Sequence, residues 1–438
     1  MTMQSEVTGS GPLRTVLLST GALLLVVAVV ISPKEAFDAS IQGLDIWWKI
    51  IFPAMLPFLM LSQMLTAFGF THALGVLLGP LMQRWFRLPG KAGLAIVVGM
   101  CGGFPAGADT ASRLLQDRQI TAKQAGIVAS TAHFANPLMI ILVIGAAFLH
   151  QPAAGYFLLG VHWVSGWIAN MIGVRILPAK SKSTRIVSSS AESKHNEIVS
   201  DLKTPNSVHQ AASFKRRSLW SQMMLAAREA QVRDGRGFGK LLGDTVSQAV
   251  QTLMMTGGYM IVFAVFIRLL TLYITPGTSV ALWPALLELH LGAYHLSQSQ
   301  LSPLLILSLL AAILGWGGLS SHLQVSAVLK AAGLASTSMF YFAGIRLLHA
   351  MIAFFTSLLL WLPFSRYSSE VWATFQTNTG NGLSPFLTKQ SLVGMNTSDI
   401  IESVWSGFPA ACIGLALLLA VMVSLSGLTF WFNRRFSR

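Results

Sequence analysis

The densest group of polar side chains inside the apolar part of this sequence follows a pair of glycines at residues 317 and 318. It comprises Ser320, Ser321, His322 and Gln324. Hydroxyl, imidazole and amide groups both donate and accept hydrogen bonds. This group therefore predicts contact with a small polar substrate or an ion near Gly317 and Gly318. The alternative is that these side chains are structural and form hydrogen bonds with one another.

A second group surrounds the sequence CGGFPAGADT at residues 101–110. Glycine and proline interrupt helices, and an open backbone in hydrocarbon is costly unless protein or a water-filled cavity surrounds it. We expect a substrate to approach the backbone here and at the start of the following helix, at Gly102, Gly103, Phe104, Gly107 and Thr110. Asp109 is expected to be the N-cap of that helix.

Two charged residues interrupt apolar segments, and such residues usually face the interior of a helical bundle. Arg346, in YFAGIRLLHAM, could bind a carboxylate substrate through its planar guanidinium. Glu288, in ALLELHLG, could couple to a cation, take a proton or cap a short helix. A structural ion pair between Arg346 and Glu288 is the alternative interpretation.

His133 and Asn136 lie three residues apart, just before Pro137. Proline removes one backbone hydrogen bond and leaves a carbonyl free in the preceding turn. Polar contacts are therefore expected at this place, either to a substrate or as satisfied structural groups.

Other patterns argue against catalysis. The sequence has no phosphate-binding glycine loop after a strand, no paired metal ligands and no nucleophile with a base at a suitable spacing. GFPAG resembles a nucleophile elbow, but Pro105 stands where the serine would be. We expect no enzyme activity, no catalytic residue, no metal and no cofactor.

The composition indicates a membrane protein. Of the 438 residues, 53% are hydrophobic and 11% charged, whereas soluble domains carry about 25% charged residues. The net charge of +14 could suggest nucleic acid as a partner, but twelve of the 30 basic residues lie between residues 180 and 240. Basic residues concentrated between apolar segments predict a cytoplasmic loop of a membrane protein instead.

The apolar segments define the expected organisation. They lie at about 15–31, 50–69, 92–108, 125–149, 153–177, 246–274, 301–319, 336–364 and 403–432. We divide the chain into an N-terminal transmembrane helix (1–32), a first repeat with its connecting helix (33–178), a basic and mostly disordered cytoplasmic loop (179–240) with a surface helix near 218–232, a second repeat (241–365), and a polar segment with a C-terminal transmembrane helix (366–438).

The two repeats show the same order: a long helix, a short amphipathic stretch, an apolar segment broken by glycine, and another long helix. Interrupted helices at matching places in two halves indicate a transporter site. We therefore predict an all-α polytopic membrane protein with two inverted repeats, each with a re-entrant hairpin, whose tips at residues 102–107 and 317–321 meet near the midplane.

The sequence also resembles a known family. PKEAFDAS, GLDIWWKIIFPAMLPF, GMCGGFPAGADTASRLL and HFANP, all within 33–178, and LLELHLGA and GWGGLSSHLQV in the second half are similar to the YlbJ family of sporulation integral membrane proteins, whose repeats belong to the Gate, or nucleoside-recognition, class. The resemblance implies a fold related to concentrative nucleoside transporters. It also implies movement of dipicolinate from mother cell to forespore across the outer forespore membrane. The resemblance implies no role for the basic loop.

These arguments predict a membrane transporter for a small planar anion, with the lipid bilayer as partner. The substrate could be accompanied by a coupling cation or proton, the chain could form an oligomer, and no nucleic acid is involved. Two other functions stay open: a nucleoside-type permease, and a non-transporting scaffold of spore morphogenesis that binds a partner or anionic lipid through the basic loop.

Overall fold

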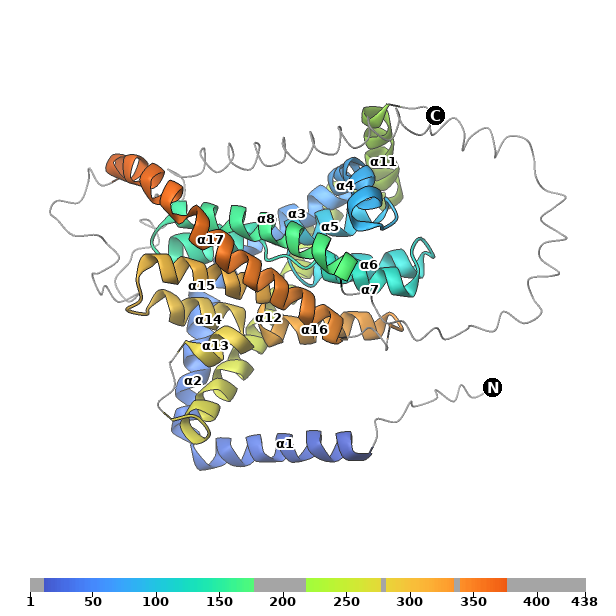
Figure 1. Ribbon diagram of the computed structural model, residues 1–438. Coiled ribbons are helices and arrows are strands. Elements are labelled where there is room, and N and C mark those ends of the chain that lie inside the picture. The colour runs from blue at the N-terminus through green and yellow to red at the C-terminus, as the bar shows by residue number, and fades with distance from the viewer. Residues whose placement is uncertain (1–11, 177–217, 277–280, 335–338, 376–438) are drawn as a thin grey trace, which may run out of the picture.

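The structure, a computed structural model, describes residues 12–176, 218–276, 281–334 and 339–375, with side chains to residue 365. Every element in these ranges is a helix (Figure 1). The first half contains α1 (Pro12–Ile31), α2 (Pro33–Ile46), η1 (Trp47–Ile51), α3 (Phe52–Ala67), α4 (Phe70–Leu81), η2 (Met82–Phe86), α5 (Ala92–Gly102), α6 (Ala106–Gln116), α7 (Ala122–Thr131), η3 (Met139–Phe148) and α8 (Pro152–Ile176). The second half contains α11 (Leu219–Asp234), α12 (Phe238–Tyr273), α13 (Leu282–Leu287), α14 (Leu289–Ser297), α15 (Pro303–Trp316), α16 (Gly318–Ala331) and α17 (Met339–Phe375).

Local sequence signals explain several helix ends. Thr121 and Gln124 form a capping box at the start of α7, in which each side chain satisfies a backbone N–H that the helix leaves free. Ser302 caps α15, and Pro303 occupies its first turn, where no backbone donor is needed. These boundaries are set by local chemistry before any tertiary packing.

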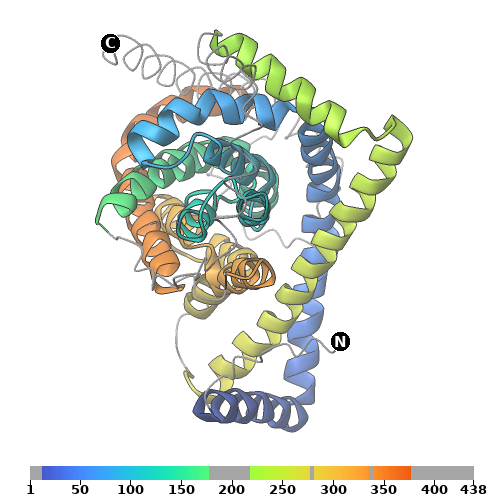
Figure 2. The same ribbon diagram turned by 90° about the vertical axis from the view of Figure 1, so that its right-hand side faces the viewer.

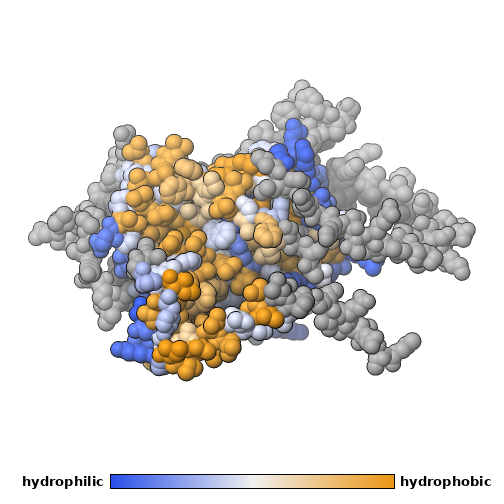
Figure 3. All heavy atoms as spheres, turned by 60° about the horizontal axis from the view of Figure 1, so that its bottom comes forward, coloured by the Kyte–Doolittle hydropathy of each residue, from blue (hydrophilic) through white to orange (hydrophobic). Residues whose placement is uncertain are grey.

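Five segments of the described chain are long and apolar enough to cross a membrane: Pro33–Ala67, Pro152–Arg175, Phe238–Tyr273, Pro303–Ala331 and Met339–Ser365. Exposed apolar side chains also cover much of the face shown in Figure 3. Such a surface is unfavourable in water and compatible with lipid. The predicted polytopic all-α class agrees with this architecture.

Two long helical segments form a wall beside the compact core. The continuous segment from α2 through η1 to α3 packs along α12 (Figure 2). The Trp47 Nε1–H donates to the Leu253 carbonyl at 2.9 Å, and the Arg268 guanidinium donates to the Glu35 carboxylate at 2.7 Å. The wall thus joins the first and second halves of the chain and presents residues of α3 and α12 to the core.

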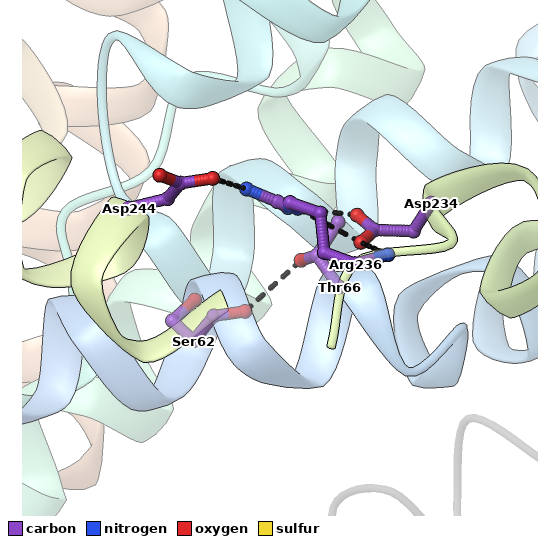
Figure 4. A network of polar contacts seen from close by, with 5 residues as sticks. All are labelled: Ser62, Thr66, Asp234, Arg236 and Asp244. Carbon is purple, nitrogen blue, oxygen red and sulfur yellow. Dashed lines mark hydrogen bonds and ion pairs between the residues drawn. The ribbon is translucent and has the colours of Figure 1, made fainter. Parts of the chain in front are cut away.

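The predicted surface helix corresponds to α11, which packs against α4 and α3. A turn links it to α12, and there Arg236 bridges Asp234, at 2.7 Å, and Asp244, at 3.0 Å (Figure 4). Hydrogen bonds from Arg236 lower the pKa of the Asp234 carboxyl from its ordinary value. The same figure shows α3 beside this turn, where the Thr66 hydroxyl donates to the Ser62 carbonyl. Through Arg236, the ion pairs join the end of α11 to the first turns of α12.

Two short helical hairpins lie in the core, one from each half. In the first, α5 and α6 pack side by side around a turn at residues 103–105. In the second, α13 and α14 pack side by side around Glu288, and the position of a Cβ on Gly292 would lie 2.6 Å from the Ala285 Cα. Each hairpin precedes an interrupted helix and then a long helix, α8 or α17.

The prediction of a hairpin tip at residues 317–321 is wrong. Residues 303–331 form one interrupted span, in which α15 and α16 follow one another and do not pack along their lengths (Figure 1). Gly317 and Gly318 both have positive φ, 84° and 75°, so they break the helix without reversing it. In the first half, the comparable interruption is residues 132–136, between α7 and η3. The sequence comparison of the two repeats, which aligned Gly102–Gly103 with Gly317–Gly318, therefore aligned a hairpin with a broken helix.

Other predictions fall outside the described residues. These include residues 177–217 of the basic loop and the C-terminal transmembrane segment at 403–432. The orientation of the helices in the bilayer stays a prediction, as do the inverted relation of the two repeats and the re-entrant nature of their hairpins.

Candidate functional site

The two hairpin tips and the two helix interruptions meet around a small cavity of about 50 Å³. It is lined by Ile51, Met55, Leu59, Gly102, Gly103, Phe104, Ala135, Asn136, Met139, Thr252, Leu253, Thr256, Glu288, His290, Ser320 and Gln324. Its apolar wall comes from α3 and η1, and α12 adds one leucine and two threonines. Drug-sized ligand pockets enclose roughly 300–1,000 Å³, so the cavity is too small for such a ligand in this structure.

The tip of the first hairpin is fastened to the first interruption. The Asn136 side-chain amide donates to the Cys101 carbonyl at 3.3 Å, and its Oδ1 accepts the Leu138 N–H at 2.9 Å. Asn136 therefore holds the end of α5 and caps the following helical segment at once. The Phe104 ring stacks on His133, with the ring centroids 4.7 Å apart.

Close backbone contacts explain the glycines of this tip. Gly103 has a φ of +78°, a conformation that side chains with a Cβ rarely adopt. A Cβ on Gly107 would lie 2.5 Å from the Ala132 carbonyl oxygen, so this residue packs against the interruption and does not line the cavity. Glycine here permits the hairpin to approach the broken helix.

The tip of the second hairpin is Glu288, which lies 2% exposed at the N-cap of α14. One carboxylate oxygen accepts the Leu291 N–H at 2.8 Å, and the other contacts His290 Nδ1 at 2.8 Å. The Trp316 indole donates to the Leu286 carbonyl at 2.9 Å, which ties the hairpin to the end of α15. The capping role considered for Glu288 is thus present, together with a histidine partner.

The two interruptions also contact each other. The Ser321 hydroxyl lies 3.4 Å from His133 Nε2 and donates to the Gly318 carbonyl at 3.0 Å. The His322 Nε2–H donates to the Trp316 carbonyl at 3.0 Å. Ser321, His133 and His322 consequently form a layer behind the cavity and support the residues that line it.

Arg346 lies fully buried beneath the first interruption. Its guanidinium donates to the carbonyls of His133, at 2.7 Å, and Ser130, at 2.9 Å, and to the Asn170 side-chain oxygen at 3.1 Å. It also contacts His349 Nδ1 at 3.2 Å. All these partners are neutral carbonyl, amide or imidazole groups, and the ion pair with Glu288 that was the alternative interpretation is absent from the described residues.

Thr110 and Asp109 have local roles on α6. The Thr110 hydroxyl donates to the Ala106 carbonyl at 3.0 Å, and Asp109 pairs with Arg113 at 2.9 Å. Pro105 is the N-cap of this helix. The prediction that Asp109 is the N-cap is wrong because α6 begins as soon as the turn ends, which puts Asp109 inside the first turn.

Seven of the predicted site residues line the cavity: Gly102, Gly103, Phe104, Asn136, Glu288, Ser320 and Gln324. The sequence argument missed Thr252, Thr256 and His290. The threonines lie four residues apart on a continuous helix, a spacing that places them on one face, but many pairs in the chain share that spacing. His290 could have been found from the sequence, because it follows Glu288 by two residues in LELH.

Comparisons with known proteins agree with this architecture. A family model described as Gate, nucleoside recognition, matches residues 48–152, which contain the first hairpin and the first interruption. The sporulation integral membrane protein YlbJ of Bacillus subtilis (strain 168) is 32% identical over 369 residues, which cover 80% of this chain and 84% of that protein. No solved structure matches the chain significantly. The chain therefore belongs to the YlbJ family of integral membrane proteins involved in sporulation, and it carries a nucleoside-recognition Gate domain.

Proposed function

We propose that this protein transports a small planar anion, dipicolinate, and that the substrate binds in the cavity between the two hairpin tips. The observation that carries the proposal is the meeting of two tips and two interrupted helices at one cavity, which polar side chains line on one side, among membrane-length segments. Interrupted helices expose backbone N–H and carbonyl groups that a polar substrate can use within a bilayer. A scaffold protein has no need for such openings.

The charge distribution supports an anion as the substrate. Arg346 supplies a buried positive charge beneath the first interruption, without a carboxylate partner among the described residues. The N-termini of η3 and α16 lie at the interruptions, and helix N-termini attract anions. Arg346 attracts the anionic substrate through its positive charge, and it positions the backbone of the first interruption by its hydrogen bonds.

The small volume of the cavity sets a requirement for the transport mechanism. Because about 50 Å³ does not hold an aromatic dicarboxylate, the hairpin tips must part from the interruptions to admit the substrate. We infer that the two halves are inverted repeats with re-entrant hairpins, so that the site opens alternately to either side. In the cell, we place the protein in the outer forespore membrane, where it moves dipicolinate from the mother cell toward the forespore.

Uptake by proteoliposomes tests this function. The purified protein should accumulate labelled dipicolinate, and unlabelled dipicolinate should compete while nucleosides do not. Gln324→Ala, at the cavity, should lower uptake at least about tenfold, which corresponds to the loss of one hydrogen bond to the substrate. Gln298→Ala, at an exposed position after α14, is the matched control and should leave uptake unchanged.

Two results would contradict the proposal. Uptake of nucleosides in preference to dipicolinate would assign the cavity to a nucleoside permease, as the description of the Gate family model suggests. Absence of uptake of either compound by folded protein would favour the scaffold function.

A further inference from the structure

We propose that Glu288 and His290 together form a proton-binding anion clamp, so that dipicolinate crosses the membrane with a proton. The inference rests on the proposed function, because it concerns the same cavity. It resolves a conflict within that cavity: a carboxylate lies at the place where an anionic substrate is expected to bind.

The geometry of the pair fixes which nitrogen can bind the proton. Both side chains line the cavity and are buried, with exposed fractions of 2% for Glu288 and 7% for His290. A carboxylate only accepts hydrogen bonds, so His290 Nδ1 carries a hydrogen and donates it to Glu288 at 2.8 Å. In the neutral imidazole, Nε2 is then the proton acceptor, and among the described residues it has no hydrogen-bond partner.

Glu288 is itself held in place for this role. Its second oxygen accepts the Leu291 N–H at 2.8 Å, so the carboxylate spans the first turn of α14. This contact and the His290 contact together orient both side chains from one short stretch of backbone at the hairpin tip. Movement of the tip therefore moves the pair as a unit.

The proton transfer can be written in full. A proton from water on the entry side binds to His290 Nε2, which makes the ring an imidazolium and brings the charge of the pair with Glu288 to zero. The new Nε2–H donates a hydrogen bond to a carboxylate of the substrate. When the site opens to the other side, the substrate leaves and Nε2 releases the proton to water there, so one proton crosses with each substrate.

Glu288 and His290 are the titratable side chains among the described residues that line the cavity. On α16, which packs against the hairpin, the nearest titratable side chain is His322, and its Nε2–H is used by the Trp316 carbonyl. On α14, Tyr294 packs against Phe148 of η3, and His295 does not line the cavity. The wall helix α12 contributes the hydroxyls of Thr252 and Thr256, and α13 and α15 contribute no titratable side chain to the lining.

The test measures proton and substrate movement together. Proteoliposomes contain a pH-sensitive dye, and the membrane potential is held at zero by potassium and valinomycin. With one proton for each substrate, the ratio of internal to external dipicolinate should rise about tenfold for each unit by which the inside is more alkaline. Addition of dipicolinate should also acidify the interior of vesicles that contain wild-type protein.

Three variants locate the effect. His290→Gln and Glu288→Gln should abolish accumulation driven by the pH gradient. Any exchange of labelled for unlabelled dipicolinate that remains in these variants should not respond to the pH gradient. His295→Gln, on the same helix but outside the cavity lining, should behave as wild type. Gradient-driven accumulation by His290→Gln would overturn the assignment of the proton to His290.

The two proposals fail in different ways. If wild-type protein takes up no dipicolinate at any pH gradient, the proposed function fails. If wild-type protein takes up dipicolinate but neither responds to the pH gradient nor acidifies the vesicles, the proton clamp alone fails. The wild-type measurement decides this even if a variant does not fold.

Discussion

Alanine in place of Gly318 is expected to reduce dipicolinate uptake by at least an order of magnitude. Gly318 has a φ of +75°, which costs a residue with a Cβ about 1–2 kcal/mol. Its Cβ would also lie 2.9 Å from the Leu289 backbone nitrogen and 3.2 Å from the Glu288 Cα. Both contacts are with backbone, so relief of the overlap requires the second hairpin to move away from the interruption, which displaces Glu288 from the cavity.

The larger Gly318→Leu change should abolish uptake. A matched control is Gly258→Ala on α12, where a Cβ meets open space and φ is that of a helix. The variants are compared by initial uptake rates at equal amounts of protein in the vesicles. Normal uptake by Gly318→Ala and Gly318→Leu would show that the contact between the hairpin tip and α16 is not part of the transport site.

Removal of the Arg346 guanidinium should destabilise the fold more than any other single change at the site. In Arg346→Ala, the carbonyls of Ser130 and His133 and the side-chain oxygen of Asn170 lose their donor. Each unsatisfied buried group costs about 1–3 kcal/mol, and the void left by a fully buried side chain adds to this. The thermal unfolding of purified protein should shift strongly downward, with loss of uptake.

Arg346→Lys distinguishes geometry from charge. An ammonium keeps the positive charge, but it is not a planar fork and cannot reach acceptors in several directions at once. We expect unfolding and uptake values between those of wild type and Arg346→Ala. A stable Arg346→Ala protein with normal uptake would contradict the role of Arg346 as the support of the first interruption.

The sequence predicted the residues of the site better than their arrangement in space. Glycine and proline residues at 102–107, and the glycine pair at 317–318, mark true breaks because their backbone preferences are local. Whether a break reverses the chain or continues it depends on what packs against it. The reversal in the second half occurs at Glu288, a residue without special backbone freedom, and is stabilised by its capping contact with Leu291.

The partners of Arg346 show a second limit. Its charge in an apolar segment correctly indicated an interior position, since a guanidinium is costly in lipid. Two of the groups that satisfy it are backbone carbonyls freed where α7 ends, and the sequence marks them only through Pro137, without showing which donor they bind. A sequence argument therefore searches for a carboxylate partner, whereas the structure supplies an interrupted helix.

Substrate protection of a cysteine in the cavity tests the central claim most directly. Gln324→Cys is made in protein whose Cys101 and Cys412 are replaced by alanine, and the rate of modification by a small thiol reagent is measured in detergent. Dipicolinate should slow this reaction in a saturable manner, and it should leave the rate for the exposed Gln298→Cys control unchanged. Equal rates for Gln324→Cys with and without saturating dipicolinate would contradict a substrate site between the two hairpin tips.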